Sequence, residues 1–122
     1  DVGNADVVIT NPQHFAVAIV YDQDGSGAPL VIAKGQGELA AKIRDLAEEN
    51  HVHMMRIPLL ARALYFTTEI NEEIPEGLYV AVAQILAYVY QLNAVVPGVP
   101  KPLQPNPEIP QDFQFNESGK RL

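Results

Sequence analysis

The stretch that decides the fold is ADVVITNPQHFAVAIVY, residues 5–21, in which two apolar runs flank Asn-Pro-Gln-His at 11–14. The runs 5–10 and 15–21 are rich in valine and isoleucine, which are favoured in β-strands. Pro12 fixes its own φ and keeps the preceding residue out of the helical region, so an Asn-Pro pair between two such runs is typical of a turn. The sequence therefore predicts two strands joined by this turn.

The turn also carries a possible backbone-cleavage reaction. The side-chain amide of Asn11 can attack its own backbone carbonyl, closing a succinimide and expelling the nitrogen of Pro12. The alternative attack by the next backbone N–H is blocked, because proline has no N–H. Cleavage is slow in a relaxed peptide, so the fold would have to hold Asn11 in an attack geometry and a base such as His14 would have to help with protons. From these residues alone, an ordinary turn with a solvated histidine remains the alternative.

Composition limits the class of protein. The 122 residues carry a net charge of −7, 48% are hydrophobic and none is cysteine. This profile predicts one soluble globular domain, a poor match for nucleic acid, without disulfides or thiolate metal sites. The longest apolar stretch, 78–92, is shorter than the roughly 20 residues that span a bilayer. We therefore expect this fragment not to cross a membrane.

Further strands and helices follow the first two strands. The expected ranges are a short apolar strand at 30–33, an amphipathic helix at 38–50, a strand at 52–57, a helix from Pro58 to about Thr67, and a helix opened by Pro75 and apolar from 78 to 92. Continuous apolarity predicts a central place for the third strand. The intervening helix predicts that the third and fourth strands are parallel, and Asn50 is expected to end that helix in a left-handed conformation.

The expected fold class is thus α/β (α+β), with a small mixed central β-sheet of about four strands flanked by about three to four helices. Residues 94–122 hold six of the ten prolines and few large apolar side chains. Such a composition buries too little surface to order itself. We expect a domain at 1–93 and a disordered, Pro-rich flexible tail at 94–122.

Four motifs occur in order along the first 93 residues. They are NPQHFAVA from Asn11, GAPLVIAKG from Gly27, PLLARALY from Pro58 and IPEGLYVAVA from Ile74. Together they closely resemble the FlhB/YscU family, the export-gate proteins of flagellar and virulence-type type III secretion. The resemblance runs from about Asp6 to Asn93.

The resemblance implies a self-cleaving cytoplasmic domain. Members of the family cleave themselves between the Asn and Pro of an Asn-Pro-Thr-His motif, which assigns Asn11 as internal nucleophile, Pro12 as the leaving nitrogen and His14 as a proton-transfer group. Gln13 stands where the family usually has Thr, a departure that bears on the rate of cleavage. Because the event happens once per molecule, no turnover enzyme and no cofactor are expected.

The resemblance also implies a small apolar patch that recognises early export substrates. The matching positions are Ala28, Pro29, Ala83 and Leu86. An Ala-Pro at a loop end beside small helix residues would leave a shallow groove that a short apolar segment could fill. The alternative is that Ala83 and Leu86 belong to the core.

The function implied is control of the export switch from rod and hook proteins to filament proteins. The expected partners are flagellar export substrates of the rod and hook type, the hook-length control protein and other export-gate membrane proteins. The expected location is the cytoplasmic face of the bacterial inner membrane, as a soluble domain of an integral membrane protein.

Several alternatives remain open. They are the paralogous virulence injectisome switch, a docking module in which Gln13 has disabled cleavage, and a metabolic enzyme that binds phosphate at Gly35–Gly37. The last motif lacks the third glycine and the lysine of stronger phosphate loops. A metal is not expected either at His51 and His53, which lack further ligands nearby, or at Asp22 and Asp24, which lack the carboxylate that completes a calcium loop.

Overall fold

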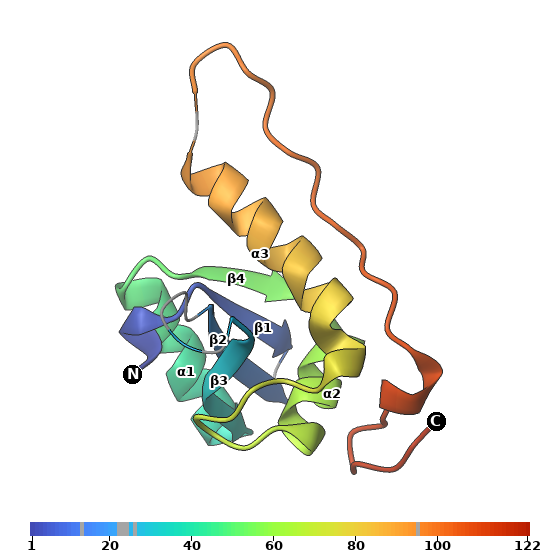
Figure 1. The fold of residues 1–122 in the computed structure, drawn as a ribbon. Helices are drawn as coiled ribbons and strands as arrows, with labels where there is room; N and C mark the ends of the chain where they lie inside the picture. Colours follow the sequence, from blue (N-terminus) through green and yellow to red (C-terminus); the bar gives the residue numbers. More distant parts are fainter. Residues whose placement is uncertain (13, 22–24, 26, 95) are drawn as a thin grey trace.

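The structure is a computed structural model that describes residues 1–12, 14–21, 25, 27–94 and 96–122. Its strands are β1 (Val7–Asn11), β2 (Phe15–Tyr21), β3 (Pro29–Gln36) and β4 (His53–Arg56), its α-helices are α1 (Glu38–Glu49), α2 (Pro58–Thr67) and α3 (Tyr79–Asn93), and its short 3₁₀ turns are η1 (Val2–Asn4), η2 (Glu76–Leu78) and η3 (Gln111–Phe113). The strands form one sheet in the order β3-β2-β1-β4 (Figure 1).

The sheet is mixed, as the sequence predicts. β1 is antiparallel to β2 and parallel to β4, and β2 is antiparallel to β3. β3 and β4 consequently run in the same direction, but they lie at opposite edges of the sheet. The expected parallel relation is therefore correct in direction only, because the connection through α1 crosses the whole sheet.

The predicted central place of the third strand is wrong, since β3 is an edge strand. Its side chains are apolar on both faces because helices cover both faces even at this edge: Val31 packs with the core on the α2 and α3 side, and Ile32 packs on the α1 side. The outer edge is also bonded. The backbone of residues 71–74 exchanges hydrogen bonds with Pro29 and Val31, which protects the strand from pairing with another chain.

Two hydrophobic cores lie on the two faces of the sheet. Successive side chains of a strand point to opposite faces, so Val7 and Ile9 of β1 pack with α2 and α3, whereas Val8 packs with α1. All three side chains are fully buried. The hairpin of β1 and β2 is thus the centre of the molecule.

Two helix ends differ in how well the sequence predicts them. Pro58 is the first residue of α2, as expected. Proline is favoured at this position because the backbone N–H of a first helical residue has no hydrogen-bond partner within the helix. Asn50 does not end α1 in a left-handed conformation, since its φ is −98° and the positive φ of 58° belongs to His51. The side-chain amide of Asn50 instead donates to the carbonyl of Leu46 at 2.8 Å, and the chain turns one residue later.

The C-terminal segment runs back along α3 and ends beside α2 (Figure 1). Ile109 is 5% exposed and belongs to the core, where Phe113 and Phe115 pack against it. The expected disordered tail at 94–122 thus contains residues that pack on the core, because the few large apolar side chains at Ile109, Phe113 and Phe115 suffice to dock it. The described residues include no helix long and apolar enough to cross a membrane.

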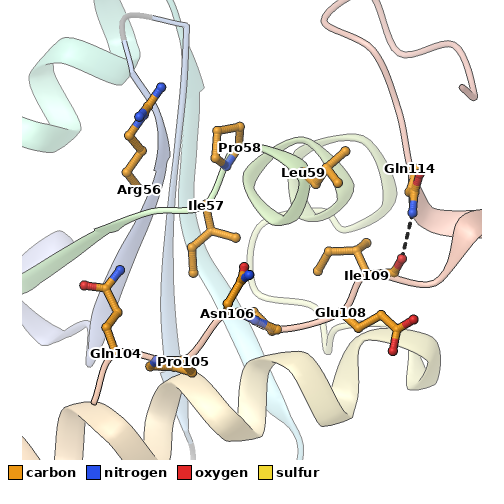
Figure 2. A pocket seen from close by; sticks show the side chains of 11 residues that line it. Arg56, Ile57, Pro58, Leu59, Gln104, Pro105, Asn106, Glu108, Ile109 and Gln114 are labelled. Atoms are coloured by element: carbon orange, nitrogen blue, oxygen red, sulfur yellow. Dashed lines mark hydrogen bonds between the residues drawn. The ribbon is translucent and has the colours of Figure 1, made fainter. Parts of the chain in front are cut away.

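Between this segment and the body lies a cleft of about 690 Å³. The body side of the cleft is lined by residues 56–59, and the segment side by residues 104–109 and Gln114 (Figure 2). Gln114 donates its side-chain amide to the carbonyl of Ile109 at 2.9 Å, which closes the segment into a compact turn around η3.

Candidate functional site

The Asn-Pro turn connects the two central strands. Asn11 is the last residue of β1 and pairs with Phe15, the first residue of β2. The backbone N–H of His14 donates to the carbonyl oxygen of Asn11 at 3.0 Å, closing a tight turn. That carbonyl is the group that the Asn11 side chain would attack, so it already carries a hydrogen bond that can stabilise negative charge on its oxygen.

Neighbouring elements hold the turn on both sides. The N–H of Gly37, at the start of α1, donates to the carbonyl of His14 at 2.9 Å. The N–H of Ile57, between β4 and α2, donates to the carbonyl of Thr10 at 3.0 Å. Two rigid junctions thus fix the backbone around the Asn-Pro bond, and Gln13 lies outside the described residues.

Exposure differs along the turn. Asn11 is 9% exposed, whereas Pro12 and His14 are on the surface. The side chain of Asn11, the candidate nucleophile, is therefore shielded from bulk water. The imidazole of His14 is in contact with bulk water and can exchange protons with the solvent. The structure brings the three residues that the sequence predicts into one turn.

A fourth group at the turn comes from the far end of the chain. The side-chain amide nitrogen of Asn11 donates to Oε2 of Glu117 at 3.4 Å, and the same carboxylate contacts Nδ1 of His14. The sequence carries no signal for Glu117, because its partners lie more than a hundred residues away and no local pattern links them.

The predicted substrate patch forms one groove of about 360 Å³. All four predicted positions line it, together with other small and aromatic residues: Tyr21, Gly27, Tyr79, Ala87 and Tyr90. The core alternative holds for Leu86, which is 5% exposed and part of the main core. Ala83, by contrast, is exposed on the surface of α3.

Tyrosines wall the groove on α3. Tyr79 and Tyr90 are each 38% exposed. The hydroxyl of Tyr90 donates to the carboxylate of Asp6 at 3.5 Å, and the same carboxylate accepts from the backbone N–H of Tyr21 at 2.7 Å. Partial burial, and then the negative charge of Asp6, raise the pKa of Tyr90 above its ordinary value.

The phosphate alternative finds no support at Gly35–Gly37. The N–H of Gly37 is bonded to the carbonyl of His14 and does not point at a ligand site. A side chain at Gly35 would meet the backbone of Leu39 at 2.9 Å, so this glycine is explained by the close approach of β3 and α1. The motif is a turn between β3 and α1.

Among the described residues, no group of three or more His, Cys, Asp or Glu side chains is placed to hold a metal ion. The ring of His53 packs edge-on against Tyr88, with the ring centres 6.0 Å apart. Asp22 and Asp24 lie outside the described residues.

Comparisons with known proteins identify the family of the chain. The model of the FlhB HrpN YscU SpaS family matches residues 1–89. The flagellar biosynthetic protein FlhB of Salmonella typhimurium is 45% identical over 117 residues, which cover 94% of this chain and 30% of that protein. FlhB of Bacillus subtilis is 48% identical over 96 residues, covering 79% and 27%. The chain thus spans about a third of the length of these relatives.

Solved structures support the same family assignment. The crystal structure of the cytoplasmic domain of FlhB from Shewanella putrefaciens is 47% identical, with a TM-score of 0.81 over 93% of this chain and 90% of that one. A mutated C-terminal domain of EscU is 28% identical, with a TM-score of 0.69 over 72% and 94%. The chain therefore belongs to the FlhB HrpN YscU SpaS family, and it has the fold of the FlhB cytoplasmic domain.

Proposed function

We propose that this domain cleaves its own chain once, between Asn11 and Pro12, and that cleavage governs a switch of flagellar export from rod and hook proteins to filament proteins. The observation that carries the proposal is the turn itself. A shielded Asn11 precedes a proline, and its carbonyl oxygen accepts the N–H of His14. Identities of 45% and 48% to two flagellar biosynthetic proteins FlhB, against 28% to the EscU domain, support the flagellar assignment over the virulence injectisome.

The chemistry needs one bond to form and one to break. Nδ2 of Asn11 bonds to the carbonyl carbon of the same residue, and the bond from that carbon to the nitrogen of Pro12 breaks. One proton leaves Nδ2 and one reaches the proline nitrogen, with His14 assisting. Water then opens the succinimide. Because the nucleophile is consumed, the event is a single self-cleavage without turnover.

The groove of Ala28, Pro29, Ala83 and Leu86 is proposed to dock export substrates of the rod and hook type. Its lining is small and apolar with tyrosine walls, which fits a short apolar segment of an unfolded chain. The groove and the cleavage turn lie on different parts of the fold, so docking does not require cleavage. The further proposed partners are the hook-length control protein and other export-gate membrane proteins, at the cytoplasmic face of the inner membrane.

Intact mass of the denatured chain tests self-cleavage directly. After incubation near neutral pH, we expect two fragments, one ending at Asn11 and one starting at Pro12. Asn11→Ala should give one full-length mass, and Asn4→Ala, which changes an exposed asparagine in η1, should cleave like the unaltered chain. A single full-length mass for the unaltered chain would contradict self-cleavage and leave the docking module, with Gln13→Thr as the variant that tests whether Gln13 is the cause.

A further inference from the structure

The C-terminal segment places a carboxylate on the cleavage turn. Oε2 of Glu117 lies 3.4 Å from the amide nitrogen of Asn11 and contacts Nδ1 of His14. One oxygen atom thereby touches both the group that must lose a proton and the group expected to move protons. In the described part of the chain, no other charged side chain forms a hydrogen bond or an ion pair with the side chain of Asn11 or His14.

The position of Glu117 is built by its own loop. Oδ1 of Asn116 accepts from the N–H and hydroxyl of Ser118 and from the N–H of Lys120, all within 3.0 Å. The N–H of Asn116 donates to the carbonyl of Lys120 at 2.8 Å, and Gly119 has a φ of 87° that other residues rarely adopt. The loop is therefore a defined turn that presents the Glu117 side chain.

Two further contacts anchor that loop to the body. Nε of Arg62 on α2 donates to the carbonyl of Phe115 at 2.7 Å. The ring of Phe115 lies 5.9 Å from that of Phe66, which lies 5.5 Å from that of Phe15, the residue after His14. A chain of packed rings thus connects the loop to the turn, and Glu117 makes a direct contact between the two.

We propose that Glu117 is a catalytic group of the self-cleavage, so that the C-terminal segment completes the cleavage site. This inference rests on the proposed function. The carboxylate orients the Asn11 amide and accepts the proton that Nδ2 loses as it bonds to the carbonyl carbon. His14 gives a proton to the Pro12 nitrogen as the carbon–nitrogen bond breaks, and protonated Glu117 restores the proton to His14. Protons balance over this single cleavage step without any further reactant.

The test measures the rate of cleavage after synthesis of the chain. The chain is made by cell-free synthesis, samples are quenched in acid denaturant, and the two fragments are quantified by intact mass. Glu117→Gln keeps the size of the side chain but removes the proton acceptor, and we expect cleavage at least about tenfold slower. Glu117→Asp, which keeps the carboxylate one methylene shorter, should recover part of the rate.

Glu108→Gln is the matched control. It removes the same charge from an exposed position of the same segment, at the cleft of Figure 2, and should cleave at the unaltered rate. The Asn11→Ala chain, which is expected to stay uncleaved, separates a structural role of Glu117 from a catalytic one. Adding Glu117→Gln to this chain should change its Tm by no more than about 2 °C, because Glu117 is half exposed.

Each outcome decides the inference. An unaltered or faster rate for Glu117→Gln overturns it, as does a slower rate that comes with a lower Tm and no recovery in Glu117→Asp. If the unaltered chain never cleaves, the proposed self-cleavage fails, and the role of Glu117 fails with it. If the unaltered chain cleaves and Glu117→Gln cleaves equally fast, self-cleavage stands and only Glu117 is excluded.

Discussion

At the scale of single residues, Tyr90 makes the stability of the fold depend on pH. Its pKa is raised in the folded chain by burial and by Asp6. A raised pKa means that the folded state binds the proton more tightly, so the stabilising contribution is present below about pH 10 and is lost as the pH rises toward the folded pKa. We expect Tyr90→Phe to flatten the fall in Tm above pH 10. Tyr79→Phe controls for loss of a tyrosine hydroxyl on the same groove, and equal alkaline profiles for Tyr90→Phe and the unaltered chain would contradict the assignment.

The proposed docking can also be tested at single residues. Ala83 is exposed and lines the groove, so Ala83→Glu puts a charge where an apolar segment would be buried, and that burial is costly. We expect at least about tenfold weaker binding of a hook-type export substrate, measured by fluorescence anisotropy, with an unchanged Tm. The neighbouring Gln84→Glu adds the same charge outside the groove and should bind normally. Equal binding by both variants would remove the groove from substrate recognition.

At the scale of elements, β1 should remain in the sheet after the chain is cut. The cut would leave residues 1–11 as a separate peptide that still pairs with β2 on one side and β4 on the other. Val7, Val8 and Ile9 are fully buried, and each contributes roughly 1.5–3 kcal/mol. We expect the fragments to co-elute in native size-exclusion chromatography and to separate in denaturant. Release of the short peptide under native conditions would contradict this prediction.

The elements also show what the sequence can and cannot predict. The hairpin around Asn11 was predictable because valine-rich runs and an Asn-Pro pair are local signals. The position of β3 in the sheet was not predictable. An edge strand with helices on both faces of the sheet has the same continuous apolar pattern as a central strand. The four groove positions were predicted through the family motifs, whereas the tyrosines that line the groove are seen only in the structure. Glu117 was not predictable at all, because its contact depends on the path of the whole C-terminal segment.

At the scale of the whole molecule, the C-terminal segment decides where the folded unit ends. The sequence predicts a boundary near residue 93, yet Ile109 is 5% exposed in the main core and Leu103, six residues earlier, is 92% exposed. Ile109→Ala removes buried side-chain volume and should cost about 2–4 kcal/mol of unfolding free energy.

Leu103→Ala deletes a similar side chain from the same segment and should be neutral within about 0.5 kcal/mol, because its side chain is already in water. Urea unfolding followed by circular dichroism measures both variants against the unaltered chain. Equal stability of all three would mean that residues 94–122 do not belong to the folded unit, as their composition alone predicts. A loss confined to Ile109→Ala would place the docked segment, and with it the loop that carries Glu117, within the cooperative fold, so that truncating the segment would be expected to impair cleavage as well as stability.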